Sequence, residues 1–259
     1  MIRPGSGFPT DHASSTTPSA HSLADVQRLA ASAPSLSHLD GRSSVCRACP
    51  RLVEWREQVA TDKRAAYATE TYWGRPVTGF GVARPRVLVM GLAPAAHGGN
   101  RTGRIFTGDR SGDWLYAALH RAGLASQPTS VNAWDGLELI DTRITLPVRC
   151  APPQNKPTPE ERDTCAPWLE KELGWVLPSV KAVVCLGSFG WASFFSTLRA
   201  LGRWDTPRTP RFTHGAEVEV GSFSVLGSFH VSQQNTFTGK LTEEMLDAVF
   251  ARAVALAHA

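Results

Sequence analysis

The sequence predicts an α/β fold: one domain of three layers, with a central, mostly parallel sheet flanked on both faces by helices. Short apolar runs alternate with segments of helical spacing from residue 86 to the C-terminus, and this pattern implies a sheet covered on both faces. The chain has 259 residues, of which 42% are hydrophobic and 19% charged. These values are typical of a globular domain with a full core.

The first half of the pattern holds two predicted strands and one helix. Residues 86–91 are apolar and end at a glycine turn, as a buried strand does. Residues 111–122 repeat apolar side chains at helical spacing and stop at Gly123. Residues 137–148 predict the second strand.

The second half opens with a helix over about residues 158–177. Thr158 is its expected cap, Pro159 its first residue, and Glu161 completes a capping box. The same reasoning predicts a strand over 182–187, a helix over 189–201, a pair of strands over 217–220 and 224–229, and a helix over 242–257 capped by Thr242.

Residues 1–40 are expected to form a flexible leader, and residues 41–259 a single domain. The leader is rich in Ser, Pro, Ala and Thr, with little periodicity, so it lacks the apolar surface that ordering requires. No apolar run reaches the roughly 18–20 residues of a membrane span, and none has the form of a signal peptide. We therefore expect an intracellular protein.

Four of the five cysteines form two pairs that suit a metal site. Cys46 and Cys49 stand in a Cys-x-x-Cys motif, whereas Cys150 and Cys165 have fourteen residues between them. Zinc sites usually use two tightly spaced pairs, so the wide second pair favours an iron–sulfur cluster. The alternative, that these are small buried hydrophobic residues, is the interpretation that we apply to Cys185 in its apolar run.

Three polar loops follow predicted strands, after Gly91, Val148 and Phe229, and ligands bind at such loops in parallel sheets. The first loop, residues 91–109, is rich in glycine, which lets the backbone approach a ligand closely. It matches neither the dinucleotide-binding motif nor the phosphate-loop motif. The sequence therefore locates a binding site but no nucleotide cofactor.

Each loop offers candidate side chains with a functional and a structural interpretation. Phe106 either stacks on a base or anchors its loop, and Asp109 either acts in the chemistry or caps the following helix. Asn155 either presents its amide to a pyrimidine edge or serves in a turn. His230 opens the third loop directly after an apolar strand, a position that favours a functional role over a structural one.

Basic residues on the same loops are candidates for contacts with phosphate groups. The argument depends on their shared placement, because a single basic residue is usually a solvated surface charge. A net charge of +4 permits a polyanionic partner without requiring one. These residues are Arg101, Arg104, Lys156 and Lys240.

Three segments together resemble the type-5 uracil-DNA glycosylases: residues 91–109 (GLAPAAHGGNRTGRIFTGD), 150–165 (CAPPQNKPTPEERDTC) and 230–242 (HVSQQNTFTGKLT). The resemblance covers about residues 43–257. Type-4 members carry an acidic residue directly after the first glycine of the first segment, where Leu92 stands here, as in the type-5 pattern. The third motif of the family usually reads His-Pro-Ser, and Val231 replaces the proline that would restrict φ.

The resemblance implies a uracil-DNA glycosylase fold and hydrolysis of the N-glycosidic bond of a uracil flipped out of DNA. It implies that Asn155 reads the base and assists cleavage of the bond as a catalytic residue, that Phe106 stacks on the base, and that His230 stabilises the departing base. Asp109 is implied to position water and to stabilise the sugar, in place of the acid that is missing at Leu92.

The resemblance also implies a cofactor and further contacts with DNA. The cofactor is a [4Fe-4S] cluster held by Cys46, Cys49, Cys150 and Cys165. It is expected to have a structural role, since hydrolysis of this bond needs no electron transfer. The residues expected to fill the gap left by the flipped base are Gln233, Gln234 and Asn235.

We therefore expect a monomeric DNA-repair glycosylase of the cytoplasm, associated with the nucleoid, that acts on uracil. Hypoxanthine and other deaminated or damaged bases are further candidate substrates. The alternative is a non-enzymatic, metal-stabilised nucleic-acid-binding protein, which would need the basic loops and the cluster but not Asp109, Asn155 or His230. An iron–sulfur electron carrier is disfavoured because a long polar pocket loop serves no purpose there.

Overall fold

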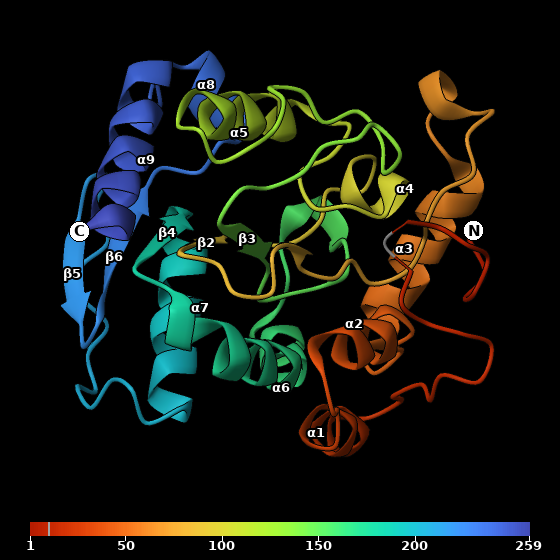
Figure 1. The fold of residues 1–259 in the computed structure, drawn as a ribbon. Helices are drawn as coiled ribbons and strands as arrows, with labels where there is room; N and C mark the ends of the chain where they lie inside the picture. Colours follow the sequence, from red (N-terminus) through yellow and green to blue (C-terminus); the bar gives the residue numbers. More distant parts are fainter. Residues whose placement is uncertain (10) are drawn as a thin grey trace.

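The computed structural model describes residues 1–9 and 11–259, in which helices pack on both faces of a six-stranded sheet (Figure 1). The α-helices are α1 (Leu23–Ala31), α2 (Leu36–Ser44), α3 (Pro50–Asp62), α4 (Gly99–Thr102), α5 (Arg110–Arg121), α6 (Pro159–Val176), α7 (Gly187–Ala200), α8 (Gln233–Phe237) and α9 (Glu243–His258). The 3₁₀ helices are η1 (Ala65–Tyr67), η2 (Pro153–Asn155) and η3 (Leu177–Ser179). The strands are β1 (Phe80–Gly81), β2 (Val87–Met90), β3 (Thr142–Thr145), β4 (Ala182–Leu186), β5 (Glu217–Val220) and β6 (Phe223–Ser228).

The sheet has the strand order β1-β3-β2-β4-β6-β5. The four inner strands run parallel, and the edge strands β1 and β5 run antiparallel to their neighbours. The carboxyl ends of the inner strands therefore meet at one edge of the sheet, where their loops lie together. This arrangement confirms the prediction of a mostly parallel sheet.

Strand side chains alternate between two hydrophobic cores, because successive residues of a strand point to opposite faces. Val87 and Val89 pack on one face beneath α5 and α9. Leu88 and Val183 pack on the other face beneath α6 and α7. Figure 1 shows these two helix pairs on opposite sides of the sheet. The three-layer α/β fold is confirmed.

Most predicted elements occur close to their predicted bounds. At the start of α6 the Thr158 hydroxyl accepts from the Glu161 N–H at 3.2 Å, and the Glu161 carboxylate accepts from the Thr158 N–H at 2.8 Å, so the capping box forms. The strand predicted over residues 137–148 is shorter than expected, because β3 is limited to Thr142–Thr145. No helix among residues 1–9 and 11–259 is long and apolar enough to cross a membrane.

The N-terminal 40 residues do not form the flexible leader that their composition predicts. Ser22 caps α1, and Ser35 caps α2. Val26 and Leu29 of α1 are buried in a cluster with Trp168 of α6. The prediction is wrong for the described part of this segment (Thr10 lies outside it), because serines that suggest disorder by composition serve here as helix caps.

Ion pairs also tie this segment to the domain. The Asp11 carboxylate accepts two hydrogen bonds from Arg75, at 2.8 and 2.9 Å. Asp40 is buried and accepts from Arg143 at 3.2 Å and from Arg149 at 3.3 Å. The N-terminal helices therefore belong to the same packed unit as the sheet.

Candidate active site

A cleft of about 780 Å³ opens where the parallel strands end. Its walls come from the loop after β2, the start of α5, the segment after β3 and the loop after β6. The cleft is lined by Phe106, Asp109, Asn155 and His230, among others. The structure therefore brings together predicted site residues from three separate loops.

Phe106 borders the cleft in a strained backbone conformation. Its φ is +52°, in the left-handed region that an aromatic residue rarely adopts. Neighbouring glycines make room for it: a Cβ on Gly91 would lie 3.0 Å from the ring, and one on Gly112 only 1.8 Å from the Phe106 carbonyl oxygen. The ring centroid lies 6.2 Å from that of His230. Strain of this kind persists only where the surroundings hold the residue firmly.

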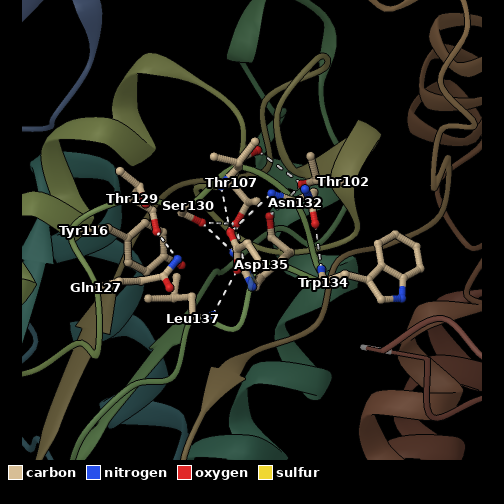
Figure 2. A network of polar contacts seen from close by, with 12 residues as sticks. Thr102, Thr107, Tyr116, Gln127, Thr129, Ser130, Asn132, Trp134, Asp135 and Leu137 are labelled. Carbon is tan, nitrogen blue, oxygen red and sulfur yellow. Dashed lines mark hydrogen bonds and ion pairs between the residues drawn. The ribbon is translucent and has the colours of Figure 1, made fainter.

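Thr107, which follows Phe106, belongs to a network of polar contacts with Ser130 and Asp135 (Figure 2). The buried Arg104 guanidinium donates to Thr107 at 2.9 Å, to Ser130 at 2.8 Å and to Asp135 at 2.7 Å. The Ser130 carbonyl also accepts from the Gly108 N–H at 2.8 Å. Arg104 thus serves inside the protein, and the expectation that it contacts phosphate is wrong.

Asp109 caps the following helix, which is its structural interpretation, and it also lines the cleft. Its Oδ1 accepts from the Gly112 N–H at 3.0 Å and so caps α5. Its Oδ2 packs against the backbone of Gly98, where a Cβ would lie only 1.8 Å from that oxygen. Burial raises the pKa of this carboxyl, although the N–H groups of Ser111 and Gly112 act in the opposite direction. A carboxylate is therefore held at one position in the cleft wall.

Asn155 lies on η2, a strained segment after β3 that lines the cleft. Gln154 and Asn155 have φ values of +55° and +56°, a conformation that asparagine tolerates better than most residues. Asn155 is exposed to the cleft. Within the described part of the chain its side-chain amide makes no hydrogen bond, so both its donor and its acceptor are available to a ligand.

His230 follows β6 and contacts the backbone of Gly187 and the side chain of Asn235. Gly187, with φ of +86° at the end of β4, brings its backbone so close that an added Cβ would lie 3.1 Å from the His230 Cβ. The Asn235 amide donates to the His230 carbonyl at 2.8 Å. Burial lowers the pKa of the imidazole to about 4. The ring is therefore neutral at physiological pH, with one nitrogen able to donate.

Arg101 is not available to phosphate groups, and that expectation is also wrong. The side chain is buried, and its three nitrogens donate to the His97 carbonyl at 2.8 Å, to Glu70 at 2.6 Å and to the Gly108 carbonyl at 2.8 Å. Lys156 and Lys240 are exposed, as expected of phosphate-binding residues. Both lie outside the set of described residues that line the cleft.

The loop after His230 divides into exposed and anchored residues. Gln233 and Gln234 are exposed and line the cleft, whereas the Asn235 amide is engaged with the His230 carbonyl. Val231, which stands where the family that the sequence resembles usually has proline, is fully buried in the core beneath α5 and α9. Burial of Val231 therefore anchors the loop where a proline ring would have restricted it.

Sequence reasoning missed several residues that line the cleft. His97 lies in the glycine-rich loop after β2, and the composition of that loop is the feature that points to it. Arg64 and Tyr67 come from a segment around η1 that has neither a motif nor a regular hydrophobic pattern. Arg110 lies directly after Asp109 and reaches the same cleft.

The four paired cysteines surround a second, much smaller cavity of about 20 Å³. Cys46 and Cys49 precede α3, Cys150 follows β3, and Cys165 lies in α6; none is in a disulfide. Burial, together with the nearby Cys150 and Cys46, raises the pKa of the Cys49 thiol to about 12. The predicted pairs therefore converge, while Cys185 is buried in the core beneath α6 and α7, as predicted.

N–H donors surround the cavity between the four cysteines. Arg56 donates to the Cys150 sulfur at 3.2 Å. The lining residues Arg149 and Trp168 each keep a buried N–H, on Nε and Nε1, without an acceptor among the described residues. An anionic sulfur cluster would supply such acceptors.

Comparison with known proteins agrees with this geometry. The family model described as the uracil DNA glycosylase superfamily matches residues 78–253. The chain is 57% identical to the type-5 uracil-DNA glycosylase of Mycobacterium bovis, over 99% of this chain and 94% of that protein. It is 56% identical to that of Mycobacterium leprae, over 88% of this chain and 99% of that protein. It is 50% identical to that of Thermus thermophilus, over 83% and 94%. The chain therefore belongs to the uracil-DNA glycosylase superfamily and, within it, to the type-5 group.

Proposed function

We propose that this chain is a DNA-repair enzyme that hydrolyses the N-glycosidic bond between uracil and deoxyribose in DNA. The observation that supports this proposal is the convergence of a carboxylate, an amide and an imidazole, from Asp109, Asn155 and His230, in one cleft. A protein that only bound nucleic acid would have no use for all three. The membership in the type-5 group and the names of the relatives support the same activity.

Recognition of the base falls to Asn155 and Phe106. An enzyme that acts on a base must take it out of the duplex and into a pocket. The free amide of Asn155 offers one donor and one acceptor to the pyrimidine edge. The Phe106 ring, fixed by its strained turn, offers a face on which the base stacks.

Cleavage of the bond leaves negative charge on uracil and positive charge on the sugar. The C1′–N1 bonding pair departs with the base, and neutral His230 donates a hydrogen bond to the uracil O2 as charge develops there. The Asp109 carboxylate stabilises the cationic sugar and orients the water whose oxygen bonds to C1′. It then accepts a proton from that water, a step that suits a carboxyl whose pKa is raised by burial.

The activity is tested by incubating the purified protein with a uracil-containing oligonucleotide and then cleaving with alkali. We expect strand scission at uracil, reduced by about 10²–10³-fold in rate in Asp109→Ala and in His230→Ala. Gly174→Ala, on an exposed face of α6 with no atom within 4 Å of the added carbon, is the matched control. Absence of scission by the wild type, or full activity in both site variants, would refute the proposal.

We also propose that Cys46, Cys49, Cys150 and Cys165 hold a [4Fe-4S] cluster. The cluster would cross-link the segment before α3 to α6 and to the segment that carries Asn155, and so support the cleft structurally. The purified protein is then expected to be brown and to contain iron and sulfide. Cys165→Ser should lose the visible absorbance, whereas Cys185→Ala should retain it. Colourless protein that contains zinc would overturn this proposal.

The range of substrates and the oligomeric state complete the proposal. We propose a monomer, associated with the nucleoid, that accepts uracil in duplex DNA and extends to hypoxanthine and other deaminated or damaged bases. A turnover panel of U·G, U·A, hypoxanthine and an undamaged control tests the range. Size-exclusion chromatography tests the monomer. Activity on U·G and U·A alone would limit the enzyme to uracil.

A further inference from the structure

One wall of the cleft carries a positive charge and a neutral hydrogen-bond donor that the proposed chemistry does not use. Arg64 lines the cleft, is exposed, and has no carboxylate paired with it among the described residues. His97 lines the same cleft, and the charge of Arg64 acts to lower the pKa of its ring after burial does. The carboxylate of nearby Glu70 is engaged with Arg101 at 2.6 Å.

A hydrogen bond to Tyr72 engages Nδ1 of His97 and leaves Nε2 without a partner among the described residues. The Tyr72 hydroxyl lies 3.0 Å from His97 Nδ1, and Tyr72 is fully buried. Burial raises the pKa of Tyr72, so the hydroxyl keeps its proton. Burial, and then Arg64 and Arg101, lower the pKa of His97, so the ring is neutral. In the tautomer in which Nδ1 accepts from the hydroxyl, the ring proton lies on Nε2, which has no other partner in the described structure.

The position of His97 relates this wall to the sugar of the substrate. His97 is followed by Gly98, whose backbone packs against the Asp109 carboxylate. If Asp109 faces the sugar at which the bond breaks, the adjacent wall faces the groups attached to that sugar. In DNA those groups are phosphodiesters, which match an arginine and an N–H donor.

We propose that Arg64 and His97 form a subsite for a phosphate of the nucleotide that is flipped into the cleft. This inference rests on the proposed glycosylase function and adds two residues to its DNA contacts. Arg64 contributes charge, whereas His97 contributes a neutral hydrogen bond through Nε2. The two contributions have different salt dependences, because only the charged contact releases a counterion from DNA.

The test is the salt dependence of binding to a duplex that carries a stable abasic-site analogue, measured by fluorescence anisotropy. For Arg64→Gln we expect weaker binding and a slope of log K against log salt that is smaller by about 1. For His97→Phe we expect an unchanged slope and binding about two- to tenfold weaker. His97→Gln keeps one acceptor and one donor, so it should bind like the wild type. Arg84→Gln is the control, since Arg84 is exposed before β2, away from the carboxyl ends of the strands.

The result that overturns the subsite is binding by Arg64→Gln with the same affinity and slope as Arg84→Gln. Because Arg64 is exposed, Arg64→Gln is expected to fold. The test therefore stays decisive even if His97→Phe does not fold. Uracil excision by the wild type is measured beforehand. If the wild type excises uracil and Arg64→Gln behaves like the control, only the phosphate subsite fails. If the wild type neither excises uracil nor binds the analogue, the glycosylase function itself fails.

Discussion

Replacing Gly98 by alanine tests whether the position of the Asp109 carboxylate determines the rate. The added Cβ would lie 1.8 Å from Oδ2 of Asp109, whereas ordinary contacts begin at 3.4 Å. The carboxylate must therefore withdraw by about 1.6 Å, and a displacement of about 1 Å already costs about 100-fold in rate. We expect kcat to fall by about 100-fold or more.

The same displacement removes the cap of α5, because the carboxylate no longer reaches the Gly112 N–H at 3.0 Å. Loss of such a cap costs about 1 kcal/mol, which lowers Tm by about 2–4 °C in a chain of this size. The protein therefore stays folded while it loses activity. Single-turnover excision of uracil and thermal unfolding are measured on the same preparation.

Gly174→Ala is the matched control, because it adds the same methyl group to an open helical position. We expect unchanged kcat and a small gain in stability from the better helix former. If Gly98→Ala were to fold and retain the wild-type kcat, the position of the Asp109 carboxylate would not limit the reaction, and the role given to Asp109 would be wrong.

Three further predictions concern groups around the site. The unfolding free energy should decline as pH falls from about 6.5 towards 4, because His230 gains a proton in the unfolded state but not in the folded state, where its pKa is about 4. The unfolding free energy of His230→Gln should decline less over this range, and an imidazole resonance of His230 that titrates near pH 6.5 would contradict the prediction. Glu172→Gln should destabilise the protein by about 3–5 kcal/mol in urea unfolding, because it removes the buried carboxylate that accepts from Arg143 at 2.6 Å. Asp135→Asn should lower kcat by about tenfold with little change in KM, because the substitution weakens the contact with Arg104 and so loosens the turn before Asp109. An unchanged kcat would show that the Arg104 network serves stability alone.

The parts of the fold and site that the sequence predicted depend on local patterns. The strands around Val89 and Val184 are buried on both faces and show as apolar runs. Because parallel strands end at one edge, their loops meet there, and Asp109, Asn155 and His230 are placed in one cleft without knowledge of the packing.

The parts that could not be predicted depend on contacts between distant residues. Arg101 and Arg104 look alike on a polar loop, and nothing nearby in the chain shows that Glu70 and Asp135 hold them inside. The N-terminal helices depend on Trp168, more than 100 residues away in the chain, for the surface against which they pack. Composition describes neither kind of contact.

The close approach of Gly187 to His230 bears on the position of the imidazole and on the range of bases that fit the pocket. His230 follows β6 and Gly187 follows the adjacent strand β4, and the backbone of Gly187 packs against the His230 Cβ. Pocket-lining residues such as Leu92 and Ala95 can therefore diverge, and with them the spectrum of bases that fit, while the imidazole stays in place. The scaffold is thus suited to engineering for new damaged bases by replacing lining side chains alone.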